Sequence, residues 1–273
     1  MFSQPEFCVV SRARLGYAGN MLSIKPWRAE VVLQFCGALL FCWCLGITSI
    51  VLLHAFGVAG FRQEDSLGVL VLSTMSVQGA AWILAFVFLK LHNVGWREAL
   101  GLHRPKWGKY ILFAISVMLL AFPVVMLVGQ ISAMTLDKLG WPVGNQRVVE
   151  MVMNAKNRWT FGYLAFFAVV LAPAAEEFIF RGILFPFMKQ LGRPKLAWLG
   201  VSLLFALIHV DAARFVPLFV LGLVLTWIYQ KTDCLLASIT AHSLFNTINL
   251  VLLHFNASIN DYLEKHLHLQ PLT

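Results

Sequence analysis

Long apolar runs that carry almost no charge leave few folds open to this chain. A helix needs about 20 mainly apolar residues to cross a bilayer. Runs near this length occupy seven stretches, at 31–56, 67–89, 110–134, 161–188, 196–210, 215–229 and 235–255. Only 12% of the residues are charged, whereas a soluble domain has roughly 25%. The sequence therefore predicts an all-α fold, a polytopic transmembrane helical bundle of about seven spans with room for an eighth. Residues 1–273 would form a single integral-membrane domain.

The positive charges favour a membrane surface as their partner. Although the net charge is +8, the Lys and Arg residues lie beside the ends of the apolar runs and do not form one patch, so we expect no nucleic-acid partner. With a cytoplasmic N-terminus, 13 of the 21 Lys and Arg fall in inner segments and 7 in outer segments, and Arg181 lies inside a span. Positive residues accumulate on the cytoplasmic side. We therefore expect a multi-pass protein, in the cell membrane if the host is bacterial, with a cytoplasmic N-terminus and the lipid bilayer around it.

Several polar residues interrupt the last four apolar runs. Such residues are costly in a membrane and usually face the interior of a bundle or a wet cavity. At a rise of about 1.5 Å per residue, they would lie roughly 12 to 20 Å from the cytoplasmic surface. Whether their faces meet depends on how the helices pack. The residues concerned are Glu176, His209, His242 and Asn246.

The stretch "LAPAAEEFIFRGILF" at 171–185 contains two adjacent glutamates that the helical spacing separates. Glu177 and Arg181 are four residues apart, the favoured arrangement for an ion pair, whereas Glu176 points about 100° away. This pattern leaves Glu176 without a local partner, as a candidate general base. Glu177 is predicted to pair structurally with Arg181, and a direct chemical role is the alternative. Pro173 is expected to kink the helix or to restart it beside a wet cavity.

Taken singly, each polar residue has a plain structural explanation, as a packing histidine or as an amide that joins two helices. Taken together, they supply what water-mediated acyl hydrolysis requires. A base activates water, an imidazole helps to orient it, and hydrogen-bond donors hold the oxyanion. The combination therefore favours a hydrolytic site.

Three motifs on successive apolar segments resemble those of the CPBP family of intramembrane proteases. This family includes the CAAX prenyl endopeptidases of the Rce1 type and bacterial Abi-type proteins. The motifs EExxxR, FxxxH and HxxxN correspond to "EEFIFR" (Glu176, Glu177, Arg181), "FALIH" (Phe205, His209) and "HSLFN" (His242, Asn246). The resemblance covers about residues 161–256, which would be the catalytic core.

The resemblance implies a role for each motif residue. Glu176 would activate the water with help from His209, and His242 and Asn246 would stabilise the oxyanion. The remaining motif residues, Glu177, Arg181 and Phe205, would support the site.

The same residues leave a metal site open as an alternative. Two histidines and a carboxylate are zinc ligands, but the HExxH motif is absent, and the residue four positions after His242 is Asn246. We therefore expect no cofactor, with zinc as the alternative.

The leading functional hypothesis is an intramembrane endopeptidase that cleaves membrane-bound or prenylated peptides and proteins. A second hypothesis is a non-proteolytic membrane interaction protein, such as a bacteriocin self-immunity factor, a role also attributed to the family. A third is a transporter or proton relay built from the same buried groups. The sequence lacks the paired, interrupted halves of an inverted-repeat carrier, which places the third hypothesis last.

Overall fold

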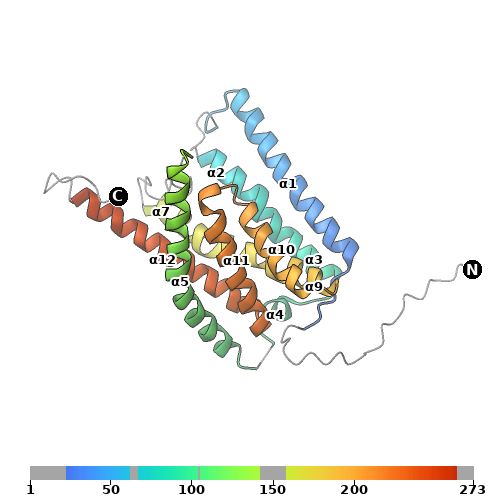
Figure 1. Cartoon of the computed structure of the whole chain (residues 1–273). Helices are drawn as coiled ribbons and strands as arrows, with labels where there is room; N and C mark the ends of the chain where they lie inside the picture. Colours follow the sequence, from blue (N-terminus) through green and yellow to red (C-terminus); the bar gives the residue numbers. More distant parts are fainter. Residues whose placement is uncertain (1–22, 62–66, 104, 142–157, 263–273) are drawn as a thin grey trace, which may run out of the picture.

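The computed structural model describes residues 23–61, 67–103, 105–141 and 158–262, and within these ranges every regular element is helical (Figure 1). In chain order, with η for π-helical segments, the elements are α1 (Ala29–Ala55), α2 (Leu67–Thr74), η1 (Met75–Gly79), α3 (Ala80–Leu91), α4 (Trp96–Ala99), α5 (Trp107–Lys138), α7 (Arg158–Phe166), η2 (Phe167–Leu171), α8 (Ala172–Glu177), η3 (Phe178–Leu184), α9 (Phe185–Gln190), α10 (Pro194–Leu207), α11 (Ala212–Thr232) and α12 (Leu235–Tyr262).

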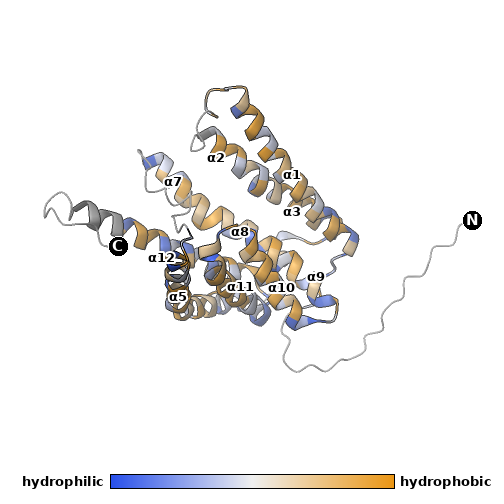
Figure 2. Ribbon diagram, turned by 45° about the horizontal axis from the view of Figure 1, so that its top comes forward, coloured by the Kyte–Doolittle hydropathy of each residue, from blue (hydrophilic) through white to orange (hydrophobic). Residues whose placement is uncertain are grey.

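The predicted polytopic helical bundle is confirmed. In the described part of the chain, six helical runs are long and apolar enough to cross a membrane: Ala29–Ala55, Gly68–Leu91, Trp107–Lys138, Arg158–Gln190, Ala212–Thr232 and Leu235–Phe255. Hydrophobic residues extend along most of the length of these helices (Figure 2). This is therefore an integral multi-pass membrane protein. Residues 1–22 lie outside the described part, and the cytoplasmic N-terminus stays a prediction.

The predicted span at 196–210 is the shorter helix α10. It has 14 residues, which gives it a length of about 21 Å. That is less than the ~30 Å hydrocarbon thickness of a bilayer. Because α10 ends early, His209 follows the end of a helix instead of lying within one. Non-helical backbone at membrane depth is tolerated where protein or a wet cavity surrounds it.

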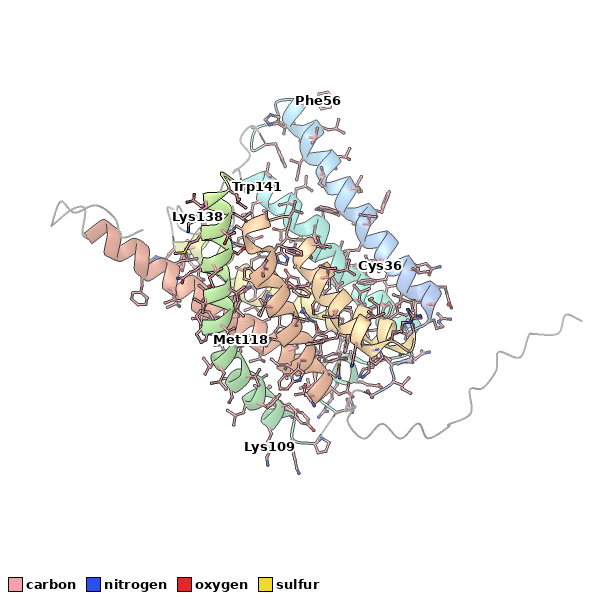
Figure 3. The ribbon with its side chains drawn as sticks, viewed as in Figure 1. Cys36, Phe56, Lys109, Met118, Lys138 and Trp141 are labelled. Atoms are coloured by element: carbon pink, nitrogen blue, oxygen red, sulfur yellow. The ribbon has the colours of Figure 1, made fainter. Side chains whose placement is uncertain are left out.

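Helix α1 lies on the outside of the molecule and packs on α2, η1 and α3 (Figure 1). A close approach fixes this contact, because a Cβ added at Gly46 would lie 2.3 Å from the Ser76 Cβ. Small residues permit such approaches between membrane helices. Elsewhere α1 presents apolar side chains outward, and Phe56 lies exposed just beyond its end (Figure 3).

The second half of the chain forms the inner part of the bundle. Helix α11 packs on both α10 and α5, and α12 packs on α5 and on α8. Lys109 and Lys138 lie near opposite ends of the long helix α5 (Figure 3). The approach of α10 to α11 is close, because a Cβ added at Gly222 would lie 3.1 Å from the backbone of Ser202. Helix α12 also packs on η3, so these contacts surround α8, which carries the two glutamates, and η3, which carries Arg181.

The run Arg158–Gln190 is one continuous helix with two π-helical segments. The first, η2, precedes Pro173, and the second, η3, precedes Pro186. At Pro173 the chain thus passes through a π-helical turn and continues as a helix. Such segments often occur at functional sites. Here they flank α8, which holds Glu176 and Glu177.

Candidate active site

Glu177 and Arg181 form the ion pair that their spacing predicts. Arg181 Nη1 lies 2.7 Å from Glu177 Oε1, and both side chains are fully buried. A charged pair inside a bundle is stable only when hydrogen bonds satisfy its remaining donors and acceptors. Each partner has such bonds to a neighbouring helix.

Arg181 binds helix α11 with the rest of its guanidinium. Its Nη2 donates to the Gly222 carbonyl at 3.0 Å, and its Nε donates to Thr226 Oγ1 at 3.2 Å. Its guanidinium carbon also lies 4.6 Å from the centre of the Phe205 ring, a cation–π contact that strengthens where water is excluded. Arg181 thus joins η3 to α10 and α11.

Glu177 binds helix α12 with both carboxylate oxygens. Ser238 Oγ donates to Oε2, and His242 Nδ1 lies 2.9 Å from Oε1. Because an ionised carboxylate only accepts hydrogen bonds, His242 Nδ1 carries the proton in this contact. The second nitrogen, Nε2, then faces away from Glu177.

Glu176 occupies a different environment from its neighbour. Its side chain is 21% exposed, and its Oε2 lies 3.9 Å from His242 Nε2. Three side chains, those of Arg181, Ser238 and His242, form hydrogen bonds with Glu177. Beside Glu176 lies the imidazole of His242. His242 thus lies between the two glutamates, one at each ring nitrogen.

His209 is held by the last turn of α10. Its Nδ1 lies 2.7 Å from the Phe205 carbonyl. A carbonyl only accepts, so Nδ1 donates and Nε2 is left with its lone pair. The Phe205 ring contacts both imidazoles, with ring centres 5.0 Å from His209 and 5.6 Å from His242. The side chain of Phe205 thus lies between the two histidines.

Asn246 lies one helical turn beyond His242 on α12. Its Nδ2 donates to the Ala168 carbonyl in η2 at 2.8 Å. This bond places the amide against the turn that precedes α8. The structure therefore brings both glutamates, His242 and Arg181 into one hydrogen-bonded group, joins His209 to it through Phe205, and places Asn246 at its η2 side.

Sequence reasoning missed Ser238, Thr226 and the Gly222 carbonyl as partners of the ion pair. Ser238 precedes His242 by four residues and so shares its helix face, a spacing that could have identified it. For Thr226 the sequence holds no such signal, because its role depends on where α11 packs.

A metal site requires clustered metal-ligating side chains. Among the described residues, no group of three or more His, Cys, Asp or Glu side chains is placed to hold a metal ion. His242 Nδ1 bonds Glu177 and His209 Nδ1 bonds a backbone carbonyl, which leaves the Nε2 atom of each histidine directed elsewhere. A metal-free site stays a prediction, with zinc as the alternative.

Comparisons with known proteins agree with the motifs. The family model for type II CAAX prenyl endopeptidase Rce1-like proteins matches residues 158–248. UPF0177 protein YxdF from Lactococcus lactis subsp. lactis (strain IL1403) is 32% identical over 78 residues, which cover 28% of this chain and 42% of that protein. The chain thus matches less than half the length of this curated relative. No solved structure matches this chain. All three motifs lie inside residues 158–248, the segment that is similar to the Rce1-like family.

Proposed function

We propose that this protein is an intramembrane endopeptidase in which Glu176 activates a water molecule for attack on a peptide bond. The family model that matches residues 158–248 describes prenyl endopeptidases, and this supports a protease. The observation that carries the assignment of Glu176 is the contrast between the two glutamates. Glu177 is fully buried and bound by three side chains, whereas Glu176 is partly exposed beside a histidine nitrogen.

The chemistry divides among groups from three segments. Glu176 removes a proton as the water oxygen bonds to the carbonyl carbon, and His209 Nε2 helps to orient that water. The carbonyl oxygen becomes an oxyanion, which His242 and Asn246 stabilise by donating hydrogen bonds. Protonated Glu176 then gives its proton to the amide nitrogen, the C–N bond breaks, and the leaving amine departs.

The second nitrogen of His242 is suited to this role. When Nε2 is protonated it donates to the oxyanion, and the adjacent Glu177 carboxylate balances the added positive charge. Arg181 keeps that carboxylate in place. The proposed role of the Glu177–Arg181 pair is therefore to support His242.

The substrate class follows from the setting of the site. The glutamates lie in a helix that is apolar enough to span the membrane, and His209 follows the end of the short helix α10. A peptide bond reaches this depth most readily when the substrate is itself in the membrane. We therefore propose membrane-bound or lipid-modified peptides as substrates, with prenylated CAAX-type peptides as one such class.

The test is cleavage by the purified protein in detergent of a fluorogenic prenylated peptide, the same peptide without the lipid, and a small membrane-peptide library. We expect cleavage by the wild type that persists with a chelator and is lost in Glu176→Ala. Glu98→Ala, at an exposed glutamate in α4, is the matched control and should cleave normally. Loss of cleavage with chelator and recovery with zinc would contradict the metal-free mechanism. No cleavage, with Glu176→Ala still functional in cells, would favour the interaction-protein alternative.

A further inference from the structure

Pro173 leaves one carbonyl of the glutamate-bearing helix without its backbone partner. The Ala172 N–H bonds to the Phe167 carbonyl five residues back, in the π-helical register. In the same register the next N–H would reach the Ala168 carbonyl, but Pro173 holds that position and has no N–H. A backbone carbonyl inside a membrane protein needs a hydrogen-bond donor. For Ala168 that donor must come from outside the helix.

Asn246 supplies it from helix α12. Its Nδ2 lies 2.8 Å from the Ala168 carbonyl, and α12 packs on both η2 and α8. Because a carbonyl only accepts, one N–H of the amide is committed to Ala168 and the orientation of the amide is fixed. The second N–H of Nδ2 is left for the site.

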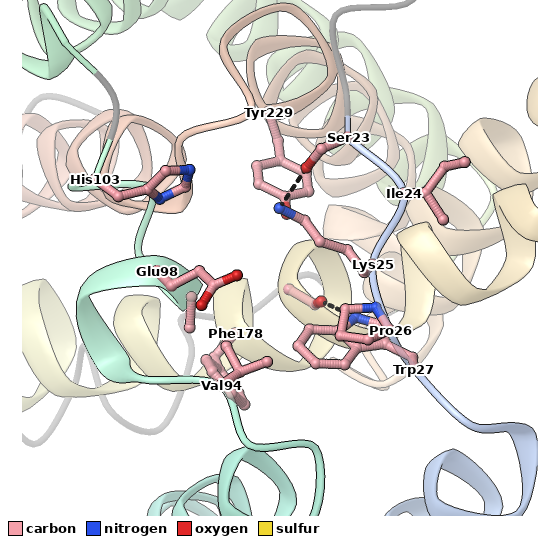
Figure 4. A pocket seen from close by; sticks show the side chains of 12 residues that line it. Ser23, Ile24, Lys25, Pro26, Trp27, Val94, Glu98, His103, Phe178 and Tyr229 are labelled. Carbon is pink, nitrogen blue, oxygen red and sulfur yellow. Dashed lines mark hydrogen bonds between the residues drawn. The ribbon is translucent and has the colours of Figure 1, made fainter. Parts of the chain in front are cut away.

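A side chain from another segment also bonds a backbone carbonyl near Pro186. The Phe185 N–H bonds the Phe180 carbonyl in the π-helical register, and the Trp27 indole Nε1 donates to the nearby Gly182 carbonyl at 2.8 Å (Figure 4). This bond lies beside a cavity of about 210 Å³ that Trp27, Phe178 and Gly182 help to line. Side chains from other segments thus bond carbonyls of this helix near both prolines.

We propose that Asn246 is a positioning residue, which holds the start of α8 by bonding the carbonyl that Pro173 leaves free. Helix α12 then binds both ends of α8, through Asn246 at η2 and through His242 at Glu177. Glu176 lies between these two bonds in the chain, and together they set its depth relative to His242. The inference rests on the proposed role of Glu176 as the base.

The test is a double-mutant cycle between Asn246→Ala and Pro173→Ala. Asn246→Ala alone should lower the melting temperature by about 5 °C, the effect of one lost buried hydrogen bond. It should also lower kcat by at least about 10-fold with little change in KM, because a displaced base weakens the transition state more than substrate binding. In the Pro173→Ala background the new N–H satisfies Ala168. In that background, Asn246→Ala should lower log kcat by less than about half as much as it does in the protein with Pro173. The fall in melting temperature should shrink in the same way.

Two matched variants control for general effects. Asn249 Nδ2 bonds the Phe245 carbonyl of its own helix at 2.9 Å, so Asn249→Ala should show no coupling to Pro173→Ala. Pro123→Ala, at the proline inside α5, should show no coupling to Asn246→Ala.

Equal losses from Asn246→Ala in the two backgrounds would overturn the proposal. Coupling in melting temperature without coupling in kcat would overturn the positioning role, since Asn246 would then act on the reaction only through the oxyanion. If the wild type cleaves no peptide, the proposed function fails. The thermal cycle then decides by itself whether Asn246 replaces the missing N–H of Pro173.

Discussion

Replacing Arg181 by Met should destabilise the protein severely, although Met fits an apolar interior. The substitution removes the three hydrogen bonds of the guanidinium and leaves the fully buried Glu177 carboxylate without its cation. Breaking a buried ion pair in this way costs about 3–5 kcal/mol. At about 2–4 °C per kcal/mol for a chain of this size, the melting temperature should fall by about 6–20 °C.

The assay is thermal unfolding in detergent of Arg181→Met, Glu177→Gln and the double variant. The double variant replaces both charges, so its melting temperature should lie above that of Arg181→Met even though it carries one more substitution. Arg193→Met, at an exposed arginine before α10, should melt within about 2 °C of the wild type. A melting temperature for Arg181→Met within about 2 °C of the wild type would refute the reasoning, because the carboxylate would then not depend on Arg181.

Three further predictions test other contacts. Ser238→Ala removes a donor from the buried Glu177 carboxylate and should cost about 1–3 kcal/mol of unfolding free energy in thermal or denaturant titration. Asp233 lies between two spans, where burial opposes its ionisation, but hydrogen bonds and the charge of Lys25 outweigh burial and lower the pKa of the carboxyl. Because the folded-state pKa lies below the unfolded value of about 3.9, the contact stabilises the protein above about pH 4 and is lost as the pH falls through the folded pKa. Asp233→Asn should therefore flatten the acid limb of a stability–pH curve, and an unchanged limb would contradict this. Gly222→Leu would force α11 away from the α10 backbone and should lower the free energy of unfolding by about 1–3 kcal/mol or more. The control is Gly37→Leu on the open face of α1, which should melt at a higher temperature than Gly222→Leu.

The sequence predicted the six membrane-crossing helical runs and one contact of the site. Apolar length identifies spans because a bilayer sets the length of a crossing helix. The pair Glu177–Arg181 was predictable because residues four apart share a helix face, and the structure contains this ion pair. The same spacing separated Glu176 from the pair, and its partly exposed side chain agrees with that separation.

The end of α10 could not be read from hydropathy. The apolar run continues through Ile208 and Val210, while the helix ends at Leu207. Val210 then adopts a positive φ of 48°, which is rare for a β-branched residue. The His209 side chain bonds the Phe205 carbonyl at this end, and hydropathy carries no signal for such a bond.

Contacts between helices could not be predicted from the sequence either. The partners of Arg181 on α11 and the bond from Asn246 to the Ala168 carbonyl depend on which helix faces meet. Pro173 indicated where the backbone hydrogen bonds of the helix would be interrupted. It could not show which side chain would replace the missing N–H donor. The prediction that Asn246 contacts the oxyanion is still to be tested by kinetics.

The central claim is that two adjacent glutamates have separate tasks, with Glu177 structural and Glu176 chemical. The most direct measurement is kcat and melting temperature on the same preparations of the wild type, Glu176→Gln and Glu177→Gln. We expect Glu176→Gln to melt like the wild type and to lose about 10²–10⁴-fold in kcat, because its carboxylate lies at the partly exposed side of the site. Glu177→Gln should melt at a lower temperature, since it breaks a buried ion pair. A Glu176→Gln variant that melts like the wild type and keeps its turnover within a few-fold would contradict the account.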